Sequence, residues 1–123
     1  MTTPYVFNPA EATAMAEAGA DLIVAHVGTT GSGTIGAKDV MSLDEAVSRI
    51  EAMLAAARGA KPDVLVICHG GPLAGPEETQ EVLRRLPGLA GFYGASSMER
   101  LPVEIAIVEN TRRFKALKLA PEV

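Results

Sequence analysis

Two histidines are the residues of this chain best suited to acid–base chemistry. His26 and His69 each come near the end of a continuous apolar run, residues 21–28 for the first and 63–70 for the second. An unperturbed imidazole titrates near pH 6.5, so either side chain could give or take a proton at neutral pH. Together they could supply half of a metal site, although two ligands without a carboxylate partner make a thin case. The alternative is a structural histidine whose ring bonds to a backbone carbonyl under a loop.

The two apolar runs echo one another weakly. Each follows an aspartate, Asp21 or Asp63, and each ends in glycine, but the two histidines are offset by one position when the aspartates are aligned. Side chains on a strand alternate between its two faces. The offset therefore means that His26 and His69 need not point the same way.

A second group of residues is suited to hold a small anion. Residues 91–102 read GFYGASSMERLP, an apolar aromatic stretch followed by small residues, Glu-Arg and a helix-opening proline. Glycine permits close backbone approach, a helix N-terminus favours negative charge, and arginine binds anions bidentately. We predict an anion site made of Gly70, Gly71, Gly94, Ser96, Ser97 and Arg100. The alternatives are that the glycines only form tight turns and that Glu99 or Arg100 serves as a helix cap or surface ion pair.

Two further motifs receive structural interpretations. Residues 31–36 match G-x-G-x-x-G, but the next helix is expected only from Ser42, so the context is wrong for a dinucleotide site. A flexible lid, with Thr29, Thr30 and Ser32 as possible donors, fits better. Cys68 lies inside an apolar strand beside His69, and neighbours on a strand face opposite sides, so we predict a buried structural thiol.

Alternating strands and helices must position these residues. Strands are predicted at residues 4–7, 21–28, 63–70 and 92–93, and helices at about 9–18, 43–58, 76–86 and 102–117. Capping boxes at Asn8 and Ser42 mark two helix starts. Apolar strands that alternate with amphipathic helices are typical of an α/β fold with a parallel sheet. The last helix should bury one stripe, which contains Val103, Ala106, Ile107, Asn110, Phe114 and Leu117.

Composition bounds the class of protein. The chain has 123 residues, enough for one domain, and its net charge of −4 argues against nucleic-acid binding. One cysteine excludes an internal disulfide and fits a reducing compartment. There is neither a signal-peptide pattern nor an apolar run near the roughly 18 residues that span a bilayer, so a cytoplasmic location is expected.

Several segments resemble one known family. They are residues 3–7, 20–26, 31–37, 68–72 and, most specifically, 91–102. These look like the phosphoenolpyruvate hydrolase-like family, also described as TIM-barrel signal transduction proteins, whose barrel forms the C-terminal part of plant Tm-1-like proteins. The resemblance covers nearly the whole chain and falls on the last four βα units of the barrel. A complete barrel takes about 250 residues, so residues 1–123 are expected to form a single half-barrel (βα)4 domain.

The resemblance implies hydrolysis, or C–C or C–P chemistry, on a small phosphorylated or carboxylated ligand. His69 and His26 would be the acid–base candidates, and a homo-oligomer or a separate N-terminal half-barrel chain would complete the barrel. Magnesium is possible by resemblance, but its carboxylate ligands would lie on earlier strands, so no metal ligand is assigned in this chain. The alternative is a non-catalytic, truncated or regulatory module that binds an anion or a partner. A Rossmann-like nucleotide binder is disfavoured by the loop at residues 31–36.

Overall fold

Four parallel strands form one sheet in the order in which they occur along the chain. A computed structural model describes residues 1–118. The strands are β1 (Tyr5–Val6), β2 (Leu22–His26), β3 (Leu65–His69) and β4 (Gly91–Phe92), and the sheet order is β1-β2-β3-β4. The predicted α/β fold is confirmed. Strand order in a doubly wound Rossmann sheet reverses at a switch point, whereas this order never reverses, as in one half of a TIM-like barrel.

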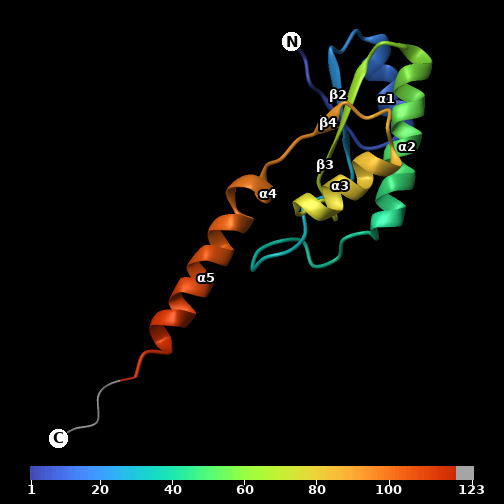
Figure 1. Cartoon of the computed structure of the whole chain (residues 1–123). Helices are drawn as coiled ribbons and strands as arrows, with labels where there is room; N and C mark the ends of the chain where they lie inside the picture. The colour runs from blue at the N-terminus through green and yellow to red at the C-terminus, as the bar shows by residue number, and fades with distance from the viewer. Residues whose placement is uncertain (119–123) are drawn as a thin grey trace, which may run out of the picture.

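The helices that connect the strands lie on one face of the sheet. They are α1 (Pro9–Glu17), α2 (Leu43–Ala60) and α3 (Pro76–Arg85). Two further helices, α4 (Ser96–Glu99) and α5 (Leu101–Lys115), follow the last strand and connect no strands. Crossovers of one hand that all step in one direction place their helices on one side of a sheet. Figure 1 shows α1 and α2 side by side against the same face. The core between these layers is apolar and includes Val6, Ile23, Ala25, Val66, Ile50, Met53 and Val82.

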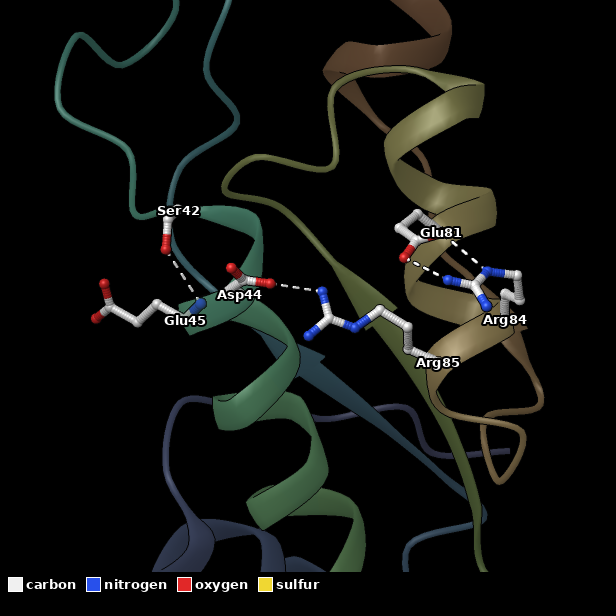
Figure 2. Close-up of polar contacts among 6 residues, drawn as sticks. All are labelled: Ser42, Asp44, Glu45, Glu81, Arg84 and Arg85. Atoms are coloured by element: carbon white, nitrogen blue, oxygen red, sulfur yellow. Dashed lines mark hydrogen bonds and ion pairs between the residues drawn. The ribbon is translucent and has the colours of Figure 1, made fainter.

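Local capping chemistry sets where the first two long helices begin. The Asn8 side chain accepts a hydrogen bond from the Glu11 N–H at 2.9 Å, and the Glu11 carboxylate accepts one from the Phe7 N–H at 2.8 Å. At the start of α2 the Ser42 hydroxyl accepts from the Glu45 N–H at 3.2 Å (Figure 2). Both predicted helix starts are therefore confirmed, but the two boxes differ. Asn8 and Glu11 bond in both directions, whereas at Ser42 only the serine half forms, because the Glu45 carboxylate pairs with Arg49 at 2.8 Å.

Helix α3 joins the same layer through its apolar face and one ion pair. Val82 and Leu86 are buried in the core. Figure 2 shows Arg85 reaching from α3 to Asp44 at the first turn of α2, with an N–O distance of 2.7 Å. An exposed pair of this kind contributes only about 0.2–1 kcal/mol, so the buried side chains hold α3 in place.

Within residues 1–118, no helix covers the opposite face of the sheet. Strand alternation places a different set of side chains there, which we call the open face: Tyr5, Leu22, Val24, His26, Leu65, Ile67 and His69, with Tyr93 just after β4. Leu65 is 51% exposed, whereas its neighbour Val66 is fully buried under the helices. A hollow of about 720 Å³ lies over this face, lined in part by Tyr5, Ile67 and Tyr93. The face is thus exposed at Leu65 and partly exposed around the hollow, whereas its central Val24 is only 2% exposed.

The C-terminal helix does not pack as the sequence predicted. An extra helical turn, α4, precedes it, so Ser96 and Ser97 lie in a helix instead of a loop. Helix α5 then projects away from the sheet (Figure 1), and Leu101 is its only buried residue. Phe114, expected on a packed stripe, is 66% exposed. In the part of the chain that the structure describes, no strand follows β4 for α5 to cover. Within residues 1–118, no helix combines the length and apolar character needed to cross a membrane.

Candidate functional site

The register of the sheet brings the two predicted histidines together. His26 and His69 are direct partners across β2 and β3, and their ring centroids are 4.9 Å apart. The pairing starts with Leu22 opposite Leu65, which absorbs the one-residue offset seen when the aspartates are aligned. Both imidazoles therefore lie on the open face at the carboxyl ends of their strands. This is the end of a TIM-type barrel at which active sites are found.

Three aromatic side chains surround the histidine pair. Tyr5 stacks on His69 with a centroid distance of 5.3 Å and an interplanar angle of 25°, and it lies 5.0 Å from His26. Phe7 lies 4.8 Å from His26, and Tyr93 lies 5.5 Å from His69. We call these five residues the histidine–aromatic cluster.

No site role was predicted for the three aromatic members from the sequence, so their part in the site was missed. Tyr5, Phe7 and Tyr93 are each about half exposed, so they wall the histidine pair without being buried beneath a layer. The positions of these three residues in the sequence could have indicated their place in the site. Tyr5 and Phe7 are two positions apart on β1 and its continuation, so they lie on the same face of the sheet. Tyr93 directly follows β4, so all three residues come near the strand ends where the histidines lie.

Each imidazole makes one hydrogen bond to the backbone. The Gly28 N–H donates to His26 Nδ1 at 3.0 Å. His69 Nδ1 lies 2.6 Å from the Tyr93 carbonyl oxygen. Burial, and then the neighbouring His69, lowers the pKa of His26. The contact of His69 with a carbonyl is the one expected of a structural histidine, but it uses one ring nitrogen only.

Two other groups near the site have raised pKa values. Burial, and then the neighbouring Tyr93, raises the pKa of Tyr5, so its phenol stays protonated at neutral pH. Cys68 lies on the other face of β3 and is fully buried, and burial raises the pKa of its thiol to about 11. Its Sγ contacts the Gly91 carbonyl at 3.6 Å. The thiol is a packing group, as predicted.

Gly70 and Gly71 serve a close crossing of two loops. Their φ angles are +84° and +56°, and a Cβ on either would collide with a backbone carbonyl, that of Gly28 or Val27. The Gly71 N–H donates to the Gly28 carbonyl at 2.7 Å. The tight-turn alternative thus accounts for both glycines, and their binding of an anion stays a prediction.

The other predicted anion-binding residues lie in different surroundings. The backbone N–H groups of residues 94–97, which include Gly94 and Ser96, make no hydrogen bond within the described residues. Ser97 lines a cavity with Gly75 and the acidic Glu77 and Glu78, away from the histidines. The predicted anion-binding set is therefore not gathered at one point by the described chain.

Arg100 is committed to a contact of its own. It pairs with Glu104 at 3.0 Å and donates to the Ser32 carbonyl at 3.2 Å. Glu104 also accepts from the Thr34 N–H at 3.0 Å. The Thr34 N–H and then Arg100 lower the pKa of Glu104. These contacts tie the loop at residues 31–36 to the start of α5, and they supply the ion pair that was expected of Glu99 or Arg100.

The described chain does not form a metal site by itself. Among residues 1–118 no group of three or more His, Cys, Asp and Glu side chains is arranged so that it could hold a metal ion. The two imidazoles have no carboxylate beside them. The residues present do not fit the magnesium that the resemblance allows, and no chemistry is assigned to a metal here.

Known proteins match this chain over almost its full length. A family model described as phosphoenolpyruvate hydrolase-like matches residues 1–117. Two tomato (Solanum lycopersicum) proteins, ToMV susceptible protein tm-1(GCR26) and ToMV resistance protein Tm-1(GCR237), are each 56% identical over 119 residues. A Sinorhizobium fredii protein, y4pA, is 32% identical over 116 residues.

These relatives are much longer than the matched segment. The match covers 97% of this chain but only 16% of each tomato protein, and 94% of this chain but 19% of y4pA. The family match spans every helix and strand described above, together with both histidines. The chain therefore belongs to the phosphoenolpyruvate hydrolase-like family.

Proposed function

We propose that this chain is one half of a TIM-barrel, phosphoenolpyruvate hydrolase-like enzyme that acts on a small phosphorylated or carboxylated ligand. The observation that carries the proposal is the pair His26 and His69, side by side at the carboxyl ends of two parallel strands. In barrels of this type the reacting groups project from that end. Imidazole is the side chain most often used for general acid–base catalysis.

Completion by four further βα units is part of the proposal. The strands run in sequential order, the helices that connect them lie on one face, and a hollow lies over the other face. At each edge a strand of two residues, β1 or β4, has one side without a partner in the described chain, and exposed edges invite pairing. The occupant that we infer is the chain adjoining this segment in longer relatives, of which the match covers only 16% in the tomato proteins.

The ligand class rests on charge and donor groups. The histidine–aromatic cluster contains no carboxylate, so it does not repel an anion. The free N–H groups of residues 94–97 follow directly after Tyr93, itself part of the cluster. Backbone N–H groups after the last strand are a common phosphate site in TIM barrels. A phosphorylated or carboxylated molecule of pyruvate size fits these features.

The test is ligand binding and turnover in a completed barrel. The chain would be fused to the segment that adjoins the matched region in tomato Tm-1(GCR237), then unfolded thermally with phosphate, phosphoenolpyruvate or oxalate, with and without magnesium. At 100 times Kd a ligand adds about 2.7 kcal/mol, which raises Tm by several degrees. We expect phosphoenolpyruvate or oxalate to raise Tm and phosphate release from phosphoenolpyruvate to depend on His69.

The matched control is Asp63→Asn, which removes a charge next to the opposite end of β3 from His69. It should leave binding and turnover unchanged, while His69→Ala abolishes turnover. If no anion changes Tm in a folded fusion protein, the proposed function is wrong.

A second candidate is a non-catalytic module that binds an anion or a partner. One observation favours it: the names of the tomato relatives concern susceptibility and resistance to a virus, and neither names a reaction. Anion binding in the completed barrel without turnover of phosphoenolpyruvate would support this candidate over the enzyme.

A further inference from the structure

The geometry points to opposite, fixed tautomers for the two histidines. We infer that His69 presents an unprotonated Nε2 as the proton acceptor of the site and that His26 presents a protonated Nε2 as a neutral hydrogen-bond donor. The catalytic use of this division rests on the proposed function. The tautomers themselves follow from the backbone contacts of each ring.

His26 is fixed by a donor. The Gly28 N–H points at His26 Nδ1 at 3.0 Å, and an N–H group can only donate. Nδ1 must therefore carry a lone pair, which leaves the proton of the neutral ring on Nε2. A second proton could enter only at Nδ1, where the Gly28 hydrogen already lies. Protonation of His26 would break this contact, so the ring is held neutral.

His69 is fixed by an acceptor. Its Nδ1 lies 2.6 Å from the Tyr93 carbonyl oxygen, and a carbonyl can only accept. Nδ1 must therefore carry the proton, which leaves the lone pair of the neutral ring on Nε2. Protonation of His69 adds a hydrogen at Nε2 and keeps the Tyr93 bond, which becomes stronger when the donor is charged. This ring can gain and lose a proton without rearrangement.

The Nε2 atoms of both rings remain available to a ligand. Neither makes a hydrogen bond within residues 1–118. His69 is only 8% exposed, but in the same range no fully buried side-chain nitrogen or oxygen lacks a partner, so each Nε2 atom keeps some contact with solvent. With ring centroids 4.9 Å apart, one small molecule can meet both.

The titratable neighbours do not upset the assignment. The two imidazole rings meet edge to face, Tyr5 from β1 contacts both, and Tyr93 contacts His69. No carboxylate or cationic side chain belongs to this group. The lowered pKa of His26, caused by burial and then by His69, agrees with a ring that favours its neutral form.

The opposite tautomers of His26 and His69 define which chemical groups the ligand must offer. The molecule would offer an oxygen lone pair, from a carbonyl, carboxylate or phosphoryl group, to the His26 Nε2–H. An O–H group, on the ligand or on an attacking water, would face His69 Nε2. In hydrolysis of a phosphorylated ligand, the water O–H bond breaks, its electron pair forms the new bond from oxygen to phosphorus, and the proton joins His69 Nε2. The bond from phosphorus to the leaving oxygen breaks with its electron pair on that oxygen, which then receives the proton from Nε2.

Nuclear magnetic resonance tests the tautomers directly in this chain. Two-bond ¹H–¹⁵N correlation spectra of the ¹⁵N-labelled protein at pH 8 distinguish Nδ1–H from Nε2–H rings. We expect Nε2–H for His26 and Nδ1–H for His69. During an acid titration, the Nδ1–H signal of His69 should persist, whereas the Gly28 amide signal should shift only when His26 is protonated. The same tautomer in both rings, or the reverse pair, would overturn the inference.

Three variants test how the atoms are used in the completed barrel. Asparagine at position 69 can keep the bond to Tyr93 but has no Nε2, so His69→Asn should lower kcat at least about 100-fold, a usual size for a lost acid–base group. Glutamine at position 26 can keep a donor near Nε2, so His26→Gln should retain more activity than His26→Asn. Equal losses in both position-26 variants would contradict the donor role.

The experiments distinguish a failure of the tautomer assignment from a failure of the proposed function. Opposite tautomers in a protein that binds no anion would leave this assignment standing and remove the proposed function. Turnover of phosphoenolpyruvate in a protein whose two histidines share one tautomer would support the proposed function and remove this assignment.

Discussion

The two faces of the sheet differ in what covers them. On one face Val6, Ile23 and Val66 are fully buried beneath α1, α2 and α3. On the other, Leu65 is half exposed and a hollow of about 720 Å³ remains. The two sets alternate residue by residue on the same strands, so local propensity cannot explain the contrast. The difference teaches that the strands were selected for burial on both sides, as expected of parallel strands, and that only one side is satisfied here.

The same comparison explains where chemistry lies. The covered face holds Cys68, whose thiol is kept protonated by burial. The open face holds His26, His69 and the tyrosines, whose polar atoms reach solvent. A side chain can meet a ligand only on the second face.

Truncation on each face should give the largest contrast. Ile23 is fully buried, and Ile23→Ala should lower the free energy of unfolding by about 2–5 kcal/mol through lost burial and a cavity. Leu65→Ala, on the open face, should cost less than about 1 kcal/mol in the chain alone. In the completed barrel the Leu65→Ala cost should rise toward the Ile23→Ala value. Urea unfolding of both variants measures this, and equal costs in the chain alone would remove the distinction between the faces.

Alanine substitution of two glycines, one beside the histidines and one in the covering helix α2, should change the stability of the chain in opposite directions. Gly70 lies next to His69 with φ +84°, and a Cβ there would strike the Gly28 carbonyl, so Gly70→Ala should destabilise the chain by about 1–3 kcal/mol. Gly59 lies in α2 with open space around it, and Gly59→Ala should stabilise by about 0.5–1 kcal/mol. Thermal unfolding compares them. A harmless Gly70→Ala would mean that the loop crossing beside the histidines is not tight.

The cap of α2 tests the covering layer with a smaller effect. Ser42→Ala removes the acceptor for the Glu45 N–H and should cost about 1 kcal/mol. Glu81→Ala, which breaks only the exposed pair with Arg84 inside α3, serves as the control and should cost under about 0.5 kcal/mol. Equal losses in the free energy of unfolding for the two variants, measured in urea, would show that the cap does not stabilise α2.

The titration of His26, on the open face, should change the stability of the chain by the smallest amount among these predictions. The pKa of His26 is lowered in the folded state, so the unfolded chain binds more protons just below pH 6.5. This contribution is complete above pH 6.5 and is lost as the pH falls through the folded pKa. Between pH 7 and 5, Tm should therefore fall, and His26→Gln should reduce that fall by less than about 5 °C.

Asp21 provides the contrast for this titration. Hydrogen bonds from Thr2 lower its pKa below the ordinary carboxyl range, so its contribution is lost only at more acid pH. Asp21→Asn should leave the slope between pH 7 and 5 unchanged. The same slope in the wild type and in His26→Gln would show that His26 does not titrate as described.

Local signals in the sequence predicted much of the fold. Asn8 and Ser42 marked helix starts, and the apolar runs ending at His26 and His69 marked the central strands. These features depend on neighbours within a few residues. The two histidines were identified for the same reason, because a polar residue at the end of an apolar strand is visible without knowledge of the sheet.

Long-range geometry could not be obtained in that way. The register that sets His26 opposite His69 depends on how β2 and β3 pack, and the echo of Asp21 and Asp63 pointed to a different alignment. Arg100 contacts Ser32, 68 positions away, instead of the neighbouring small residues. The direction of α5 depends on what lies beside β4, which no pattern within α5 encodes.

Native mass spectrometry of this chain, co-expressed with the segment that adjoins the matched region in tomato Tm-1(GCR237), tests most directly whether the open face is the inner face of a barrel. A one-to-one complex is the expected result, because four strands from each part would cover the open face and pair both edges. A chain that remains a stable, well-folded monomer in that mixture, or that pairs only with a second copy of itself, would contradict the account.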